Sequence, residues 1–202
     1  MGIHERKKQH KDDLRQSILD AAEQLFTNQG YGNVTMRGIA RKIEYSATTI
    51  YLYFKDKREI FVRLMEQYYK RLLAIMLDIQ EKHGEDPLLC IRKGMRAYTD
   101  FGLENPNYYK LAFMLTPEIP REDYMDRTYV GYHVLDTLRG NVSACIEAGI
   151  FRKTDVETAT QILWCMNHGI TSLLISNPGY PWTQREKLID SYIEKAVAGL
   201  KA

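Results

Sequence analysis

The chain has 202 residues, of which 45% are hydrophobic and 27% charged, so it is long enough for one or two domains with a buried core. Its net charge of +2 is divided unevenly: residues 1–58 hold eleven Lys or Arg and seven Asp or Glu, whereas the remainder holds seventeen and nineteen. A basic segment on a mildly acidic body indicates that one end meets a polyanion, although a solvated charged tail gives the same numbers.

The chain contains three cysteines, Cys90, Cys145 and Cys165, without paired spacing. This pattern argues against a disulfide framework and for a reducing compartment. The N-terminus lacks the apolar region of a signal peptide, and no apolar run approaches the roughly 18 residues of a membrane span. We therefore expect a cytoplasmic protein with no membrane partner.

Apolar residues recur at helical spacing almost throughout, which predicts an all-α fold of about nine helices. Gly30 ends the first helix, and the long fourth helix starts at Asp56 with a capping box completed by Glu59. Asn105 and Pro106 cap and start the sixth helix. The helices expected after the first span residues 35–42, 46–53, 56–82, 87–103, 106–115, 124–148, 155–176 and 183–200.

The stretch from Val34 to Phe61 places two very short helices almost in contact. Counted from Met36, the positions that pack two helices at a steep angle hold the residues Ile39, Ala40, Ile43, Tyr45, Ile50 and Tyr53. Ser46 can cap the second helix of the pair, which leaves its first turn facing a DNA major groove. This spacing indicates a helix-turn-helix, a motif that also occurs in helical domains that never touch DNA.

The same residues carry a family resemblance. With "VTMRGIARKI", "SATTIYLYF" and "KDKREIF", the chain resembles the TetR family of transcriptional repressors over residues 14–61, and "ILWCMNHGITSLLIS" is similar to the Trp…His-Gly signature of one subgroup. Glu44 departs from the family pattern, because the turn usually has Gly there; either Glu44 takes a strained positive φ or the turn is shaped differently. Gly38 replaces an acidic residue that often completes a capping box with Thr35.

The resemblance implies a helix-turn-helix DNA-binding domain in residues 1–58, joined by the long fourth helix to a ligand-binding and dimerisation domain in residues 59–202. Short side chains at the start of the third helix permit close approach to bases, while Tyr51 and Lys57 look like the family's phosphate contacts. The candidate DNA-binding residues are Thr35, Arg37, Ala47, Thr48, Thr49, Tyr51 and Lys57. The basic residues Arg6, Lys7, Lys8 and Lys11 form either an arm that strengthens binding or a disordered tail.

The resemblance also implies that the second domain binds a small molecule and forms a homodimer. Aromatic residues suit an apolar or planar ligand, although each can equally be ordinary core. The candidate ligand-binding residues are Phe101, Tyr109, Phe113, Trp164 and His168. We expect the eighth and ninth helices to form the dimer, because both carry apolar residues beyond one core-facing stripe, such as Ile162, Met166, Leu173, Leu188, Ile189, Tyr192, Ile193 and Val197.

Cys165 and His168 share a helix face, which would also suit a thiolate–imidazole pair or two metal ligands, but no third group accompanies them. We therefore expect no enzyme, metal or cofactor. The sequence predicts a ligand-responsive repressor that binds a pseudo-palindromic operator as a homodimer and is released by a small apolar or aromatic effector. The alternative is a helix-turn-helix DNA-binding protein without a ligand, controlled by a protein partner.

Overall fold

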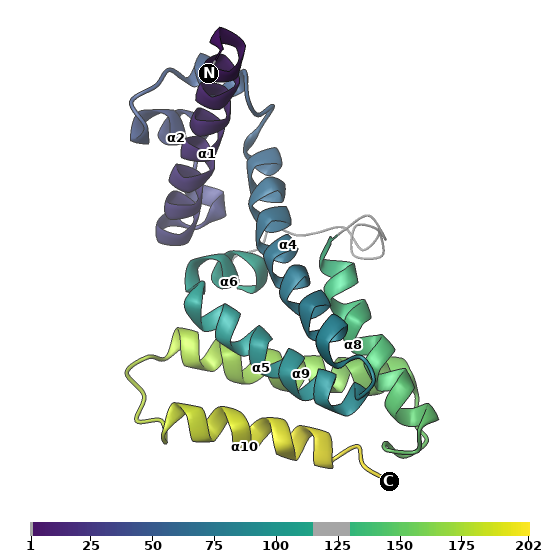
Figure 1. The fold of residues 1–202 in the computed structure, drawn as a ribbon. Helices are drawn as coiled ribbons and strands as arrows, with labels where there is room; N and C mark the ends of the chain where they lie inside the picture. The colour runs from purple at the N-terminus through teal and green to yellow at the C-terminus, as the bar shows by residue number, and fades with distance from the viewer. Residues whose placement is uncertain (1, 115–129) are drawn as a thin grey trace. The chain divides into compact units, whose positions relative to one another are not determined.

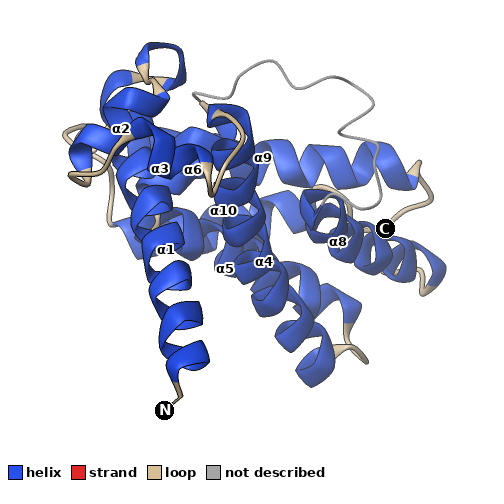
Figure 2. Cartoon of the chain, turned by 90° about the horizontal axis from the view of Figure 1, so that it is seen from above, coloured by secondary structure: helices blue, strands red, loops and turns tan. Residues whose placement is uncertain are grey.

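The structure, a computed structural model, describes residues 2–114 and 130–202. Within them the chain is helix and loop, with one isolated bridge between Phe151 and Lys201 (Figures 1 and 2). The all-α expectation is therefore confirmed. The helices are α1 (Ile3–Gln29), the 3₁₀-helix η1 (Tyr31–Asn33), α2 (Met36–Lys42), α3 (Ala47–Tyr51), α4 (Lys57–His83), α5 (Pro87–Glu104), α6 (Pro106–Phe113), α8 (Val130–Glu147), α9 (Val156–Ser176) and α10 (Arg185–Ala198).

Local sequence signals place five of the helix ends. Gly30, with φ of 76°, stops α1. The side chains of Thr35, Ser46, Asp86 and Asp155 each accept a hydrogen bond from a backbone N–H three residues later, and so cap α2, α3, α5 and α9. These helices begin where the sequence predicts because each cap needs only a polar side chain and its own first turn.

Several predicted helix ends need correction, including both ends of the ninth helix, which spans Arg185–Ala198 instead of 183–200. Asp56 accepts from the backbone N–H of Glu59 at 2.8 Å, but the Glu59 carboxylate accepts from Lys55 rather than from Asp56. Asn105 closes α5, because its side-chain amide donates to the Phe101 carbonyl at 2.9 Å. The third helix ends at Tyr51, two residues early. Residues 115–129, which include the last residue of the predicted sixth helix and the start of the seventh, lie outside the described residues.

Among the described residues, the chain divides into two compact units. The first unit comprises α1 to α3, α4 as far as Tyr68, and α6 from Asn107 on. Its core includes an aromatic group in which the ring centroids of Phe26, Tyr31 and Phe61 lie 5.2–6.3 Å apart. Phe61 belongs to this unit, which continues along α4 as far as Tyr68, and the predicted domain division after residue 58 stays a prediction.

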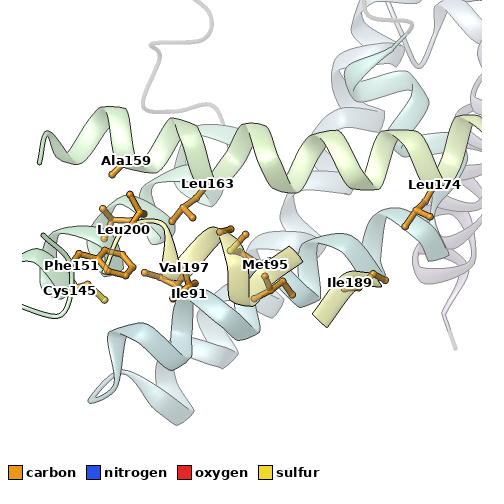
Figure 3. Packing of buried hydrophobic residues seen from close by; sticks show 13 residues of the cluster. Ile91, Met95, Cys145, Phe151, Ala159, Leu163, Leu174, Ile189, Val197 and Leu200 are labelled. Carbon is orange, nitrogen blue, oxygen red and sulfur yellow. The ribbon is translucent and has the colours of Figure 1, made fainter. Parts of the chain in front are cut away.

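In the second unit, α5, α8, α9 and α10 pack against one another, and the unit also includes α4 from Tyr69 on. Figure 3 shows its core, to which Met95 of α5, Leu163 of α9 and Val197 of α10 contribute buried side chains. The apolar residues of α10 are used inside this core, since Ile189, Ile193 and Val197 are at most 5% exposed. Of these two helices, α9 therefore carries the exposed large apolar side chains, whereas Leu188 and Tyr192 of α10 are half-buried; the prediction that both helices form the dimer stays a prediction. No described helix is long and apolar enough to cross a membrane.

Candidate nucleic-acid interface

The connection between α2 and α3 is a tight turn. The backbone N–H of Tyr45 donates to the Ala40 carbonyl at 3.0 Å, and that of Glu44 donates to Arg41 at 3.2 Å. Glu44 has φ of 59°, the left-handed region that glycine prefers. The turn thus needs a positive φ, and because an exposed glutamate stands there instead of glycine, the folded state is destabilised by about 1–2 kcal/mol.

The contact between the two helices rests on small and aliphatic side chains. Ile39, Ala40 and Ile50 are at most 2% exposed, and the half-buried Ile43 and Tyr53 flank them. Tyr45 departs from the prediction, because 43% of it is exposed. A tyrosine can cover its ring while its hydroxyl stays in water, which is compatible with this partly exposed position.

The short α3 presents its exposed face through residues spaced three and four apart. Thr48 is exposed, Tyr51 is 54% exposed, and Leu52, at the end of the helix, is 77% exposed. Thr49 is half-buried, and its hydroxyl lies 2.9 Å from the hydroxyl of the capping residue Ser46. Of the two threonines predicted to read bases, Thr48 is thus the one whose hydroxyl lies outside the cap.

Leu52 is a residue that the sequence analysis missed. It lies four residues after Thr48 and therefore on the same helix face, opposite the buried Ile50. A helical wheel centred on Ile50 would have placed Leu52 on the exposed side together with Thr48. With Ala47 half-buried at the start of α3, the exposed face consists of Thr48, Tyr51 and Leu52.

Lys57 is held within the first unit by contacts that the sequence does not suggest. Its ammonium donates to the carbonyls of Tyr31, Val34 and Gly32 at 2.8, 3.1 and 3.3 Å. It also lies 4.4 Å from the centroid of the Tyr31 ring. An ammonium has three N–H donors, and these three carbonyls match that number. The predicted phosphate contact of Lys57 stays a prediction, and it requires the ammonium to leave these three carbonyls or to bind a phosphate together with them.

Arg15 is a second positioning residue that the sequence analysis missed. Its guanidinium lies 4.5 Å from the centroid of the Phe54 ring and donates to the Tyr53 carbonyl at 3.4 Å. This contact joins α1 to the chain that follows α3, across 38 residues of sequence. Thr35 and Arg37, at the start of α2, are both exposed, and the Thr35 hydroxyl accepts from Gly38 at 3.1 Å.

The predicted ligand-binding residues fall in both units. In the first unit, Tyr109 is fully buried and its ring centroid lies 4.9 Å from that of Phe113. In the second, Phe101 is buried, and the half-buried rings of Trp164 and His168 lie 6.3 Å apart. Burial lowers the pKa of His168 below its usual range, which favours the neutral imidazole.

A buried polar cluster in the second unit also escaped the sequence analysis. The Thr99 hydroxyl lies 3.1 Å from both the Asn167 side-chain oxygen and the Tyr192 hydroxyl, and Thr171 donates to Thr99 at 3.3 Å. Tyr192 also donates to Asn167, and burial raises the pKa of Tyr192 to about 12. Beside this cluster, the Tyr98 hydroxyl lies 3.4 Å from Nδ1 of His168. Helical periodicity counts Tyr192 as apolar, so it gave no sign of a polar core.

The helix pair, its capped second helix and the exposed face of that helix define a helix-turn-helix protein. The family model described as "Bacterial regulatory proteins, tetR family" matches residues 18–64, and that described as "Tetracyclin repressor-like, C-terminal domain" matches residues 91–198. The chain therefore belongs to the TetR family and is a DNA-binding transcriptional regulator of that family.

Proteins with similar sequences are also described as helix-turn-helix transcriptional regulators. The transcriptional regulator AcrR of Shigella flexneri is 34% identical over 86 residues, which are 43% of this chain and 40% of AcrR. An uncharacterized regulator of Bacillus subtilis, YobS, is 25% identical over 158 residues, 78% of this chain and 76% of YobS. The match thus spans well under half the length of AcrR and somewhat over three quarters of YobS.

Solved structures share the fold. A tetR-family regulatory protein from Rhodococcus RHA1 has a TM-score of 0.79 at 17% identity, covering 93% of this chain and 97% of its own. FadR from Bacillus subtilis, solved in complex with stearoyl-CoA, has a TM-score of 0.77 at 21% identity, covering 92% and 98%. At these identities the likeness concerns the fold alone.

Proposed function

We propose that this regulator is a cytoplasmic repressor that binds a pseudo-palindromic operator in double-stranded DNA as a homodimer and is released by a small apolar or aromatic effector. The observation that carries DNA reading is the exposed face of α3, where Thr48, Tyr51 and Leu52 lie together opposite the buried Ile50. A helix held this way enters the major groove, which is wide enough to admit it.

Each residue of the interface has a role that its chemistry permits. Thr48 can bond to a base edge, and the methyl groups of Thr48 and Leu52 can meet the methyl group of thymine. The hydroxyl of Tyr51 suits a phosphate oxygen, as do the exposed Thr35 and Arg37 at the start of α2. Phosphate contacts fix the position of α3, and the base contacts give it sequence preference.

The homodimer is supported by the surface of α9. Ile162, Met166 and Leu173 are 45%, 41% and 49% exposed, and they lie on one side of the helix together with Gly169. A contiguous apolar row in water is a sign of an interface, and a glycine within it permits close approach of a second helix. We infer that α9 packs against α9 of a second copy, with the α10 helices outside the centre of the contact.

The effector is assigned to the second domain because of its aromatic side chains and its polar groups. Trp164 and His168 lie near one another on α9, and neutral His168 can accept or donate a hydrogen bond. A regulator of similar fold was solved with stearoyl-CoA, a molecule with a long apolar chain. Stearoyl-CoA is therefore a reasonable first probe, next to aromatic compounds.

Selection of bound fragments from a random DNA pool tests the DNA-binding part of the proposal. We expect two inverted half-sites whose centres lie about 34–36 Å apart or a multiple of one DNA turn. Thr48→Ala should relax the preference at one position of each half-site, by about 1–3 kcal/mol, while Thr49→Ala acts mainly through the cap of α3. Recovery of no common sequence from a protein that is folded and dimeric would contradict the proposal.

Titration of the DNA complex with candidate effectors tests the regulatory part. A ligand that releases DNA must bind the free protein more tightly than the complex, and DNA must weaken ligand binding by the same factor. If no compound changes DNA affinity while a second protein does, the alternative of a protein-controlled regulator is favoured.

A further inference from the structure

The first turns of α1 form a helical extension beyond the part of the helix that packs in the first unit. Figure 1 shows α1 as one continuous helix, and from residue 5 on its first buried residue is Leu14. Residues 5–13 are all exposed. The expectation of a disordered tail is thus replaced by a projecting helix of about two to three turns.

Charge is unevenly distributed around this extension. Glu5 to Asp13 contains four basic and three acidic residues, so its net charge of +1 alone says little. At about 100° per residue, however, Lys7, Lys8 and Lys11 fall within an arc of about 100° on one face. The rest of the circumference holds Glu5, Arg6, Asp12 and Asp13, with a net charge of −2, and Gln9 there donates to Asp13 at 2.8 Å within the helix.

The basic face continues the row of residues that forms the core further along α1. Lys7, Lys11, Leu14 and Ile18 follow one another at spacings of four and three residues, as one face of a helix requires. Leu14 and Ile18 are at most 7% exposed, whereas the two lysines are exposed. Cations thus occupy the positions at which apolar residues would stand if protein covered the extension, so this face suits an anionic partner.

The lysine face of α1 leads to the chain that follows α3, the helix proposed to read the bases. Arg15, one turn beyond Lys11, bonds to the Tyr53 carbonyl and lies over the Phe54 ring, directly after α3. Lys11 and Lys7 are therefore about 6 and 12 Å further along a rigid helix that starts from this contact. Duplex DNA carries a phosphate charge about every 1.7 Å of its axis, so a duplex read by α3 offers the nearest dense row of anions.

We propose that Lys7, Lys8 and Lys11 form a phosphate-binding face that contacts the DNA backbone beside the half-site read by α3. This inference rests on the proposed operator binding and assigns to it a second contact region. Such a face strengthens binding to every sequence and reads none, because phosphates are the same at each position. It also extends the length of duplex that each protomer needs for full affinity.

The test compares the wild type with the triple variant Lys7→Gln, Lys8→Gln and Lys11→Gln in DNA titrations between 50 and 300 mM salt. Glutamine keeps a similar helix propensity, so the fold should be unaffected. The probes are the duplex recovered from the random pool and a duplex of scrambled sequence. We expect the slope of log affinity against log salt to fall by at least about two units for a dimer, at about 0.9 for each phosphate that the variant no longer neutralises.

Three comparisons distinguish an effect of this lysine face from an effect of the protein's net charge. Lys93→Gln, Lys153→Gln and Lys187→Gln remove the same charge from exposed positions of the second unit and should leave the slope unchanged. The exchange Lys11→Gln with Gln9→Lys keeps the composition and moves one charge to the opposite face, and should also lower the slope. Trimming the duplex to the edges of its half-sites should weaken the wild type but not the triple variant.

The outcomes are distinguishable. If the wild type shows no preference between the selected and scrambled duplexes, the proposed function fails. If the wild type shows that preference but the triple variant keeps its salt slope, or if the second-unit variant shows an equal fall in slope, the phosphate-binding face is wrong while operator binding stands. Equal sensitivity of both proteins to trimming would overturn it as well.

Discussion

Replacement of Lys57 by Met tests whether this cation supports the fold of the first unit before any DNA is bound. The change keeps the length of the side chain and removes all three N–H donors that hold the carbonyls of Tyr31, Gly32 and Val34. Two of these hydrogen bonds are partly buried and come from a charged donor, and the Tyr31 ring adds a cation–π contact. The free energy of unfolding should fall by about 2–3 kcal/mol, because the released carbonyls gain water only in part.

Urea unfolding in the absence of DNA measures this destabilisation, with Lys55→Met as the matched control from the same segment. Lys55 is exposed, so its replacement should change stability by less than about 0.5 kcal/mol. Hydrogen exchange of η1 and of the first turn of α2 should accelerate in Lys57→Met alone. If stability stays unchanged while the salt slope of DNA binding falls by about one unit, Lys57 serves the phosphate contact predicted from the sequence and its bonds to the three carbonyls have no energetic role.

Further changes test the turn, the caps, the effector domain and the dimer. Glu44→Gly should raise the free energy of unfolding by about 0.5–1 kcal/mol, since relief of the positive φ outweighs the added chain entropy, whereas Glu44→Ala should not. Gly38→Glu should stabilise α2 by about 1 kcal/mol in urea unfolding, and more than Gly38→Ala, because the carboxylate can complete a capping box with Thr35. The pKa of His168 is lowered in the folded state, so the unfolded state binds more protons at mildly acidic pH. The contribution of neutral His168 to stability is therefore present above about pH 6.5 and is lost as the pH falls below that value. His168→Gln should make the urea midpoint depend less on pH between pH 7.5 and 5. Met166→Glu should yield folded monomers in sedimentation experiments, and a persistent dimer would exclude the α9 row as its interface.

The sequence by itself determined the helices, the family and the position of the reading helix. Gly30, Thr35, Ser46 and Asp155 act within one turn of their own helix, so residue type and spacing suffice to place these ends. At Glu44 the sequence left two alternatives open, a positive φ or a different turn, and the structure has the positive φ. The resemblance to the TetR family rests on the same short stretch, where the residues that carry it are contiguous.

Only the tertiary structure decided what the long side chains contact. Lys57 meets Tyr31 and Val34 across 26 and 23 residues and Arg15 meets Tyr53 across 38, and no local pattern marks these partners. Periodicity likewise finds apolar residues on α9 and α10 but cannot say which helix keeps its apolar face in water, because burial depends on the other helices of the unit. Those neighbours cover α10, leave Ile162, Met166 and Leu173 of α9 exposed, and enclose a polar cluster around Asn167 that the chain assembles from three separate helices.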